Sequence, residues 1–163
     1  MKWLIAHAAD YRGDPGRVIL AGHSAGAYNA AMLALDPRWL GADRKSVRGL
    51  IGLAGPYNFA PFTDPVAKAT FAGVADQAST QPVNLVSRDE PAAFLATGDR
   101  DTTVFPANSD ALAAKLLAAG NVVERRRYPN VGHVGLVTAI AKPFRSHAAV
   151  LDDMIAFARQ QTE

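Results

Sequence analysis

Residues 18–35 hold the pattern that most constrains the fold of this chain. An apolar run, Val18–Ala21, leads into residues 22–26 (GHSAG), and a helix-like stretch follows directly through Leu35. A strand that turns at G-x-S-x-G into a helix is the context of a nucleophile elbow. The glycines fit because so tight a turn has room only for small neighbours of the serine. The pattern predicts an α/β fold with Ser24 held out of the sheet at a strand end.

Ser24 has a second interpretation, as the cap of an ordinary helix that follows a Gly-rich turn. The strand and helix that flank the pentapeptide favour the elbow over this alternative. Ser24 also lies at a helix N-terminus, where unpaired N–H groups and the helix dipole favour developing negative charge. We therefore take Ser24 as the candidate nucleophile.

A serine hydroxyl is a weak nucleophile, so Ser24 needs a base, and the base needs an orienting acid. Asp101 lies in a polar turn after the strand-like residues 91–97, and His133 follows a second strand-like run, 122–128. Both residues come just past the carboxyl end of a predicted strand, where parallel α/β sheets build their sites. Asp101 is the candidate acid and His133 the candidate base.

Nearby polar residues have alternative roles. Asp99 is the rival acid, although its side chain also suits the formation of a turn. His23 lies inside the elbow, and we expect a structural side chain that points away from the Ser24 hydroxyl. His133 alone would be an ordinary loop histidine, and its place after the last predicted strand is what favours a catalytic role.

Apolar periodicity and turn residues predict an alternation of helices and strands. Helices are expected at 2–12, 25–36, 64–73, 106–119 and 146–161, and strands at 17–21, 47–53, 92–97 and 122–128. Residues 55–90 show no clear period and contain several prolines, so we expect a short cap or a long loop there, around the 64–73 helix. The length of the chain favours a single domain over 1–163.

These segments together resemble the α/β-hydrolase superfamily, close to its carboxylesterase and acetyl-esterase branch. Residues 11–27 are very similar to the elbow region of that branch, and residues 98–104 resemble its G-x-x-D-x-x-V acid turn. Gly132-His133 resembles its histidine turn. The resemblance implies a partial α/β-hydrolase fold of about four mostly parallel strands with flanking helices. It also implies Ser24 as nucleophile, Asp101 as acid and His133 as base, with no cofactor.

The chain departs from this family before the elbow. Family members carry several strands and a His-Gly-Gly-rich loop there, and that loop supplies part of the oxyanion hole. Here one helix-like segment precedes Ser24, so we expect an N-terminally truncated domain with one oxyanion donor, the Ala25 backbone N–H. Strand 17–21 would then lie at an exposed sheet edge, and we expect self-association through that edge.

The sequence predicts a serine hydrolase that cleaves small carboxylic esters through an acyl-enzyme. Arylformamidase-like or peptidase activity on the same triad is a close variant, and a non-catalytic fragment or interaction module is the alternative. The formal charge of +2 gives no argument for nucleic acid, and no apolar run suits a membrane helix. No cysteine, metal-ligand spacing or nucleotide-binding motif is present. The expected location is cytoplasmic, with a leader in a missing N-terminal segment left open.

Overall fold

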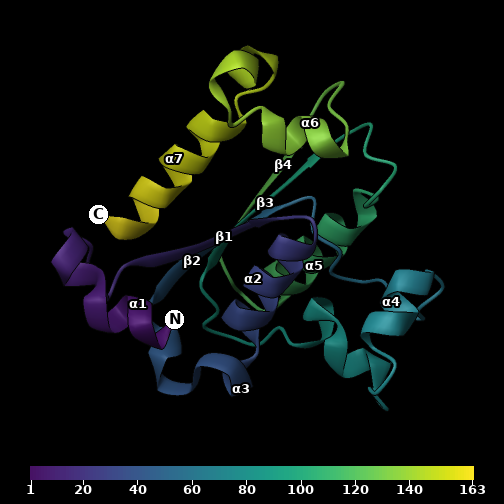
Figure 1. The fold of residues 1–163 in the computed structure, drawn as a ribbon, viewed down its shortest axis with the longest axis horizontal. Helices are drawn as coiled ribbons and strands as arrows, with labels where there is room; N and C mark the ends of the chain where they lie inside the picture. The colour runs from purple at the N-terminus through teal and green to yellow at the C-terminus, as the bar shows by residue number, and fades with distance from the viewer.

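The computed structural model describes residues 1–163, and its centre is a sheet of four parallel strands (Figure 1). The strands are β1 (Val18–His23), β2 (Val47–Leu53), β3 (Ala92–Gly98) and β4 (Val123–Tyr128). They lie side by side in sequence order, and each neighbouring pair is parallel. All four carboxyl ends therefore meet at the same end of the sheet.

Helices connect the strands and cover both faces of the sheet. They are α1 (Lys2–His7), α2 (Ala25–Leu35), α3 (Pro37–Leu40), α4 (Pro65–Thr70), α5 (Ala107–Ala118), α6 (His133–Thr138) and α7 (Val150–Thr162). Short 3₁₀ turns lie at 8–11, 41–46, 77–80, 82–84 and 142–147. No helix is both long enough and apolar enough to cross a lipid bilayer.

The central strands are apolar on both sides because each face packs against helices. Leu50 and Leu95 belong to a buried cluster that α2 and α5 complete on one face. Their neighbours Ile51 and Phe94 point the other way and pack with Phe157 of α7. Successive strand residues alternate between faces, so a continuous apolar run is what a strand buried on both sides requires.

Most of the predicted elements are present, with ends shifted by a few residues. β2 has the predicted bounds, and the predicted helix 2–12 is divided into α1 and the 3₁₀ turn at 8–11. The prediction of a final helix from 146 was wrong at its start. Residues 142–147 form a separate 3₁₀ turn, and Ala148 is extended, so α7 begins at Val150. The short helices α3 and α6 were not predicted.

The segment 55–90 holds α4 and two 3₁₀ turns between irregular stretches. Asp64 caps α4, since its carboxylate accepts hydrogen bonds from the backbone N–H groups of Val66 and Ala67 at 2.8 and 3.0 Å. Aromatic rings from this segment pack against one another and against Tyr28 of α2; they are Phe59, Phe62 and Phe71. The segment is thus anchored to α2, and its role as a cap stays a prediction.

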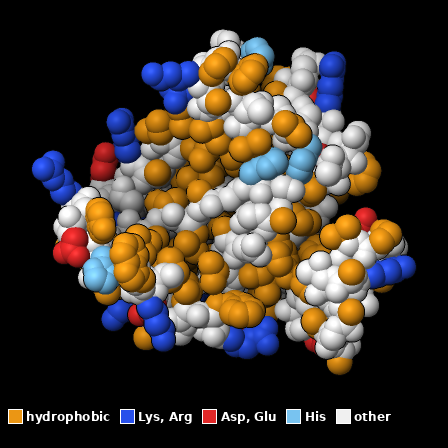
Figure 2. All heavy atoms as spheres, in the orientation of Figure 1, with side chains coloured by type: hydrophobic (Ala, Val, Ile, Leu, Met, Phe, Trp, Pro, Cys, Tyr) orange, Lys and Arg blue, Asp and Glu red, His pale blue; other side chains and the backbone are white.

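β1 forms one edge of the sheet, where the sequence analysis expected strand 17–21 to lie. Its backbone pairs with β2 alone, and Ala21 on this strand is exposed. Figure 2 shows hydrophobic side chains gathering on this face of the molecule, between α1 and α7. On α1 the side chains of Trp3 and Leu4 are exposed as well. An open strand edge therefore lies beside an apolar surface.

Candidate active site

Ser24 lies between the carboxyl end of β1 and the first turn of α2. Its φ of 56° and ψ of −124° form a conformation that residues with a side chain rarely adopt. Gly22 makes the turn possible, because a Cβ atom there would overlap the backbone of Gly26 and Ala27. The Ser24 N–H donates to the carbonyl oxygen of Leu53 in β2 at 2.8 Å, which ties the turn to the sheet.

His133 is the first residue of α6, a few positions after β4 ends. Its Nε2 atom lies 2.9 Å from Oγ of Ser24, and its Nδ1 atom lies 2.7 Å from Oδ2 of Asp101. A carboxylate can only accept, so Nδ1 carries the proton in a neutral ring and Nε2 is free to accept from the serine hydroxyl. The imidazole is therefore oriented for removing the Ser24 proton.

Asp101 lies in the turn after β3, and its side chain is fully buried. Its second oxygen, Oδ1, accepts hydrogen bonds from the backbone N–H groups of Thr103 and Val104, both at 2.9 Å. These bonds fix the carboxylate, so the oxygen that faces His133 has little freedom to rotate. Burial of a carboxylate is tolerated when its oxygens are paired in this way.

Asp99 has a different role from Asp101. Its Oδ1 atom accepts a hydrogen bond from the backbone N–H of Asn130 at 2.7 Å, and its own N–H donates to the carbonyl of Tyr128 at 3.0 Å. Asp99 therefore joins the loop after β3 to the loop after β4. The structure brings Asp101 to His133, whereas the Asp99 side chain bonds to a loop 31 residues away and not to the nearby N–H groups of a local turn.

His23 makes a contact that the sequence analysis did not predict. Its Nε2 atom lies 3.0 Å from the backbone carbonyl oxygen of His133, and the centres of the two rings are 4.6 Å apart. A carbonyl oxygen can only accept, so Nε2 of His23 is the donor. Burial lowers the pKa of His23 from its usual value. The one signal in the sequence is that His23 directly precedes the candidate nucleophile.

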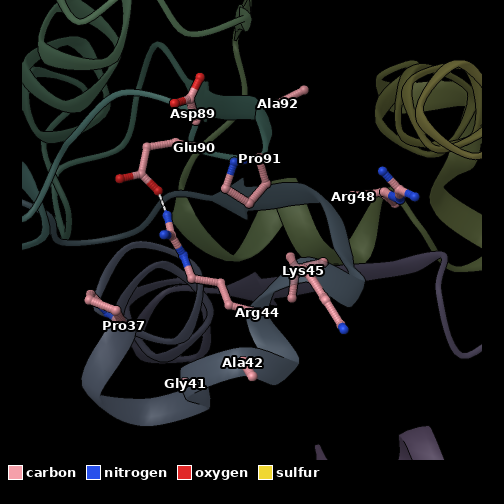
Figure 3. A pocket seen from close by; sticks show the side chains of 11 residues that line it. Pro37, Gly41, Ala42, Arg44, Lys45, Arg48, Asp89, Glu90, Pro91 and Ala92 are labelled. Atoms are coloured by element: carbon pink, nitrogen blue, oxygen red, sulfur yellow. Dashed lines mark ion pairs between the residues drawn. The ribbon is translucent and has the colours of Figure 1, made fainter.

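A hollow at the other end of the sheet lies away from these residues. It has a volume of about 530 Å³ and is lined by residues at the amino ends of β2 and β3. Figure 3 shows Arg44 and Glu90 pointing toward each other here, and the two form an ion pair. Nε of Arg44 also donates to the carbonyl of Ala34 at 2.6 Å. Since the pair joins two segments of the scaffold, we assign this end of the sheet a structural role.

Two arginines of the run 125–127 pair within the fold. Nε of Arg125 donates to Asp110 of α5 at 3.0 Å, and Arg127 pairs with the same carboxylate. Nη2 of Arg125 also donates to Oγ1 of Thr97 at 2.6 Å. Arg125 and Arg127 therefore join β4 to α5. No group of three or more His, Cys, Asp or Glu side chains is placed to hold a metal ion.

Comparison with known families identifies the fold. The family model described as BD-FAE matches residues 1–116. The chain belongs to the BD-FAE family. The matched residues include Ser24 and Asp101, whereas His133 lies beyond them. This result confirms the predicted membership of the α/β-hydrolase superfamily on its esterase side, and the four parallel strands confirm the predicted fold class.

Two curated proteins of Mycobacterium tuberculosis are similar in sequence to this member of the BD-FAE family. One is esterase LipQ, 30% identical over an alignment of 174 residues that spans 93% of this chain and 41% of LipQ. The other is the probable carboxylic ester hydrolase LipM, 26% identical over an alignment of 123 residues that spans 64% of this chain and 28% of LipM. The chain therefore spans less than half the length of these relatives.

Solved structures share the fold at lower sequence identity. A truncated form of a carbohydrate esterase from gut microbiota superposes with a TM-score of 0.75 at 20% identity, over 99% of this chain and 65% of that one. Esterase 2 of Thermogutta terrifontis, phosphoramylated by tabun, superposes with a TM-score of 0.77 at 16% identity, over 98% and 60% of the two chains. The arrangement of strands and helices is thus that of these enzymes.

Proposed function

We propose that this chain is a serine hydrolase that cleaves carboxylic esters, with Ser24 as nucleophile, His133 as base and Asp101 as orienting acid. The observation that carries the proposal is the continuous series of hydrogen bonds from Ser24 through His133 to Asp101, at 2.9 and 2.7 Å. Nucleophile, base and third group in this order form the arrangement that activates a serine.

In the first half of the reaction, Oγ of Ser24 attacks the acyl carbon while Nε2 of His133 takes the hydroxyl proton. The imidazolium that forms is stabilised by the carboxylate of Asp101. When the bond between the acyl carbon and the alcohol oxygen breaks, His133 gives its proton to that oxygen. The alcohol leaves, and the acyl group stays on Ser24 as an ester.

Water clears the acyl-enzyme in the second half. His133 takes a proton from the water molecule, the hydroxide oxygen bonds to the acyl carbon, and the bond to Oγ breaks. The proton passes to Oγ, so Ser24 is regenerated and the carboxylic acid is released. Both halves use the same two hydrogen bonds, and neither needs a cofactor.

The negative charge that develops on the carbonyl oxygen of the substrate is stabilised by hydrogen bonds from backbone N–H groups. We assign the first to the N–H of Ala25, which begins α2, because a helix N-terminus favours negative charge. Each such donor contributes about 10² to 10³-fold to the rate. We expect the chain to hydrolyse short activated esters.

The relatives support an ester as the substrate class. LipQ is named an esterase and LipM a probable carboxylic ester hydrolase. The solved esterase 2 forms a covalent phosphorus adduct with tabun. By analogy, an electrophilic phosphorus probe is a suitable reagent for Ser24.

Reaction with a fluorophosphonate probe tests the proposal on the chain as it stands. We expect the probe to add to Ser24, with the adduct located by peptide mass spectrometry, and hydrolysis of p-nitrophenyl acetate. Ser24→Ala is the matched control and should abolish both signals. A wild-type chain that does not react would favour the non-catalytic alternative. Hydrolysis that persists in Ser24→Ala would remove Ser24 from the mechanism.

A further inference from the structure

The loop before His133 is tied to the turn after β3 through Asn130 and Val131, whereas α6 itself contributes little to holding His133. α6 has six residues, its N-terminus receives no side-chain cap, and Leu136 is its one buried residue. The hydrogen bond from His23 Nε2 to the His133 carbonyl oxygen therefore joins this segment directly to the end of β1. His23 is adjacent to Ser24 in the chain, so the bond links the backbone of the base to the turn of the nucleophile.

Two further contacts restrict the His133 side chain. The His23 ring lies against the His133 ring, with centres 4.6 Å apart and planes inclined by 45°. Asp101 holds Nδ1 of the imidazole at 2.7 Å. The His133 ring therefore contacts a carboxylate and a second imidazole, and that second imidazole also binds the His133 backbone.

We propose that His23 is a positioning residue, which sets the distance between His133 Nε2 and Ser24 Oγ by donating a hydrogen bond to the His133 carbonyl. The proposal rests on the function proposed above, because it assigns a task within that triad. A misplacement of about 1 Å between reacting groups can lower a rate by about 100-fold, so a bond that fixes this distance affects turnover directly.

A neutral His23 suits this task. His133 becomes positively charged when it takes the Ser24 proton, and a second positive charge 4.6 Å away would oppose that step. Burial favours the neutral form of His23, and the groups that act on its charge are His133 and Asp101. A neutral imidazole still donates from Nε2, so His23 holds the backbone without adding charge.

Two variants of matched length separate the hydrogen bond from the bulk of the side chain. His23→Gln places an amide N–H where Nε2 lies, whereas His23→Met fills the same space without a donor. The first readout is the rate of fluorophosphonate addition to Ser24, resolved into maximal rate and probe affinity. The second is the His133 Nδ1–H signal in ¹⁵N-histidine NMR, which is accessible because the chain has four histidines. The third is the thermal midpoint of unfolding.

We expect His23→Met to lower the maximal labelling rate by about tenfold, with unchanged probe affinity, as the loss of one hydrogen bond allows. His23→Gln should restore most of that rate. The Nδ1–H signal should be sharp in the wild type and His23→Gln and broadened in His23→Met. A merely structural residue would instead lower the thermal midpoint and leave the rate of the folded protein unchanged.

Equal labelling rates and equal Nδ1–H signals in His23→Met and the wild type would overturn the positioning role. A wild-type chain that does not react with the probe would overturn the proposed function instead. In that case the NMR comparison alone decides, because the Nδ1–H signal reports the orientation of His133 whether or not Ser24 reacts.

Discussion

Gly98 packs so closely against Val131 that a Cβ atom on the glycine would overlap the carbonyl oxygen of Val131. The N–H of Arg100 donates to that same oxygen at 3.0 Å. Gly98 ends β3 just before Asp101, and Val131 precedes His133 by two positions. The contact therefore holds the acid turn against the loop that carries the base.

Replacing Gly98 by Ala should separate these two loops. We expect a loss of about 1–3 kcal/mol in the free energy of unfolding, as for overpacked sites, and slower labelling of Ser24. Urea denaturation and probe kinetics measure the two effects. Gly73→Ala is the control, because no atom lies within 4 Å of a Cβ at that position. Equal effects of the two variants would show that the Gly98 contact is unimportant.

The acid assignment is tested by a pair of isosteric substitutions. Asp101→Asn should reduce labelling and hydrolysis by about 10³ to 10⁴-fold, since an amide no longer stabilises the required tautomer of His133. Asp99→Asn should change either rate little, because the amide oxygen can still accept from the N–H of Asn130. Steady-state kinetics distinguish the two. If Asp99→Asn has the larger effect, the acid is Asp99.

The backbone conformation of Ser24 predicts a gain in stability on loss of the side chain. Its φ of 56° is unfavourable for any residue with a Cβ atom, and a strained residue of this kind costs about 1–3 kcal/mol. Ser24→Gly should therefore be more stable than Ser24→Ala by about 1 kcal/mol or more. Thermal unfolding measures the difference. Equal stabilities would mean that the elbow is not strained.

Stability should fall in mild acid because of His23. Burial holds its pKa below the ordinary value of 6.5 in the folded chain, so the unfolded chain binds a proton that the folded chain does not. The contribution of neutral His23 to the free energy of unfolding is fully present above the pKa that His23 has in the unfolded chain. It is lost as the pH falls through the pKa that His23 has in the folded chain. Chemical denaturation between about pH 7 and pH 5 should therefore show a steeper decline in the wild type than in His23→Gln. Parallel curves would contradict this account.

The open edge of β1 predicts self-association of the chain. Unpaired backbone groups on an edge strand can pair with another copy, and a charged side chain on such an edge opposes the pairing. Ala21→Lys places a charge on the exposed part of β1, and Ala114→Lys places the same charge on the exposed side of α5 as a control. Analytical ultracentrifugation should show self-association of the wild-type chain. Ala21→Lys should reduce this association, and Ala114→Lys should leave it unchanged. A monomeric wild-type chain at micromolar concentration would refute the prediction.

The sequence was most informative where local pattern determines structure. The turn at Ser24 and the bounds of β2 follow from glycine spacing and apolar runs, and these were predicted. The helix that begins at His133 was missed, because Gly132 and Gly135 weaken any helical signal and its packing through Leu136 stabilises it. The bond from His23 to the His133 carbonyl joins residues far apart in the chain, so no local pattern reports it.

The three side chains of the proposed triad follow three different strands, β1, β3 and β4. Of these three strands, β4 is the last to be synthesised. A nascent chain that has completed β1 to β3 carries Ser24 and Asp101 but no His133. With the roles proposed here, the serine stays inert during synthesis and becomes reactive when β4 pairs with β3. In a refolding experiment, the rate at which probe-reactive protein appears would therefore measure how fast β4 pairs with β3.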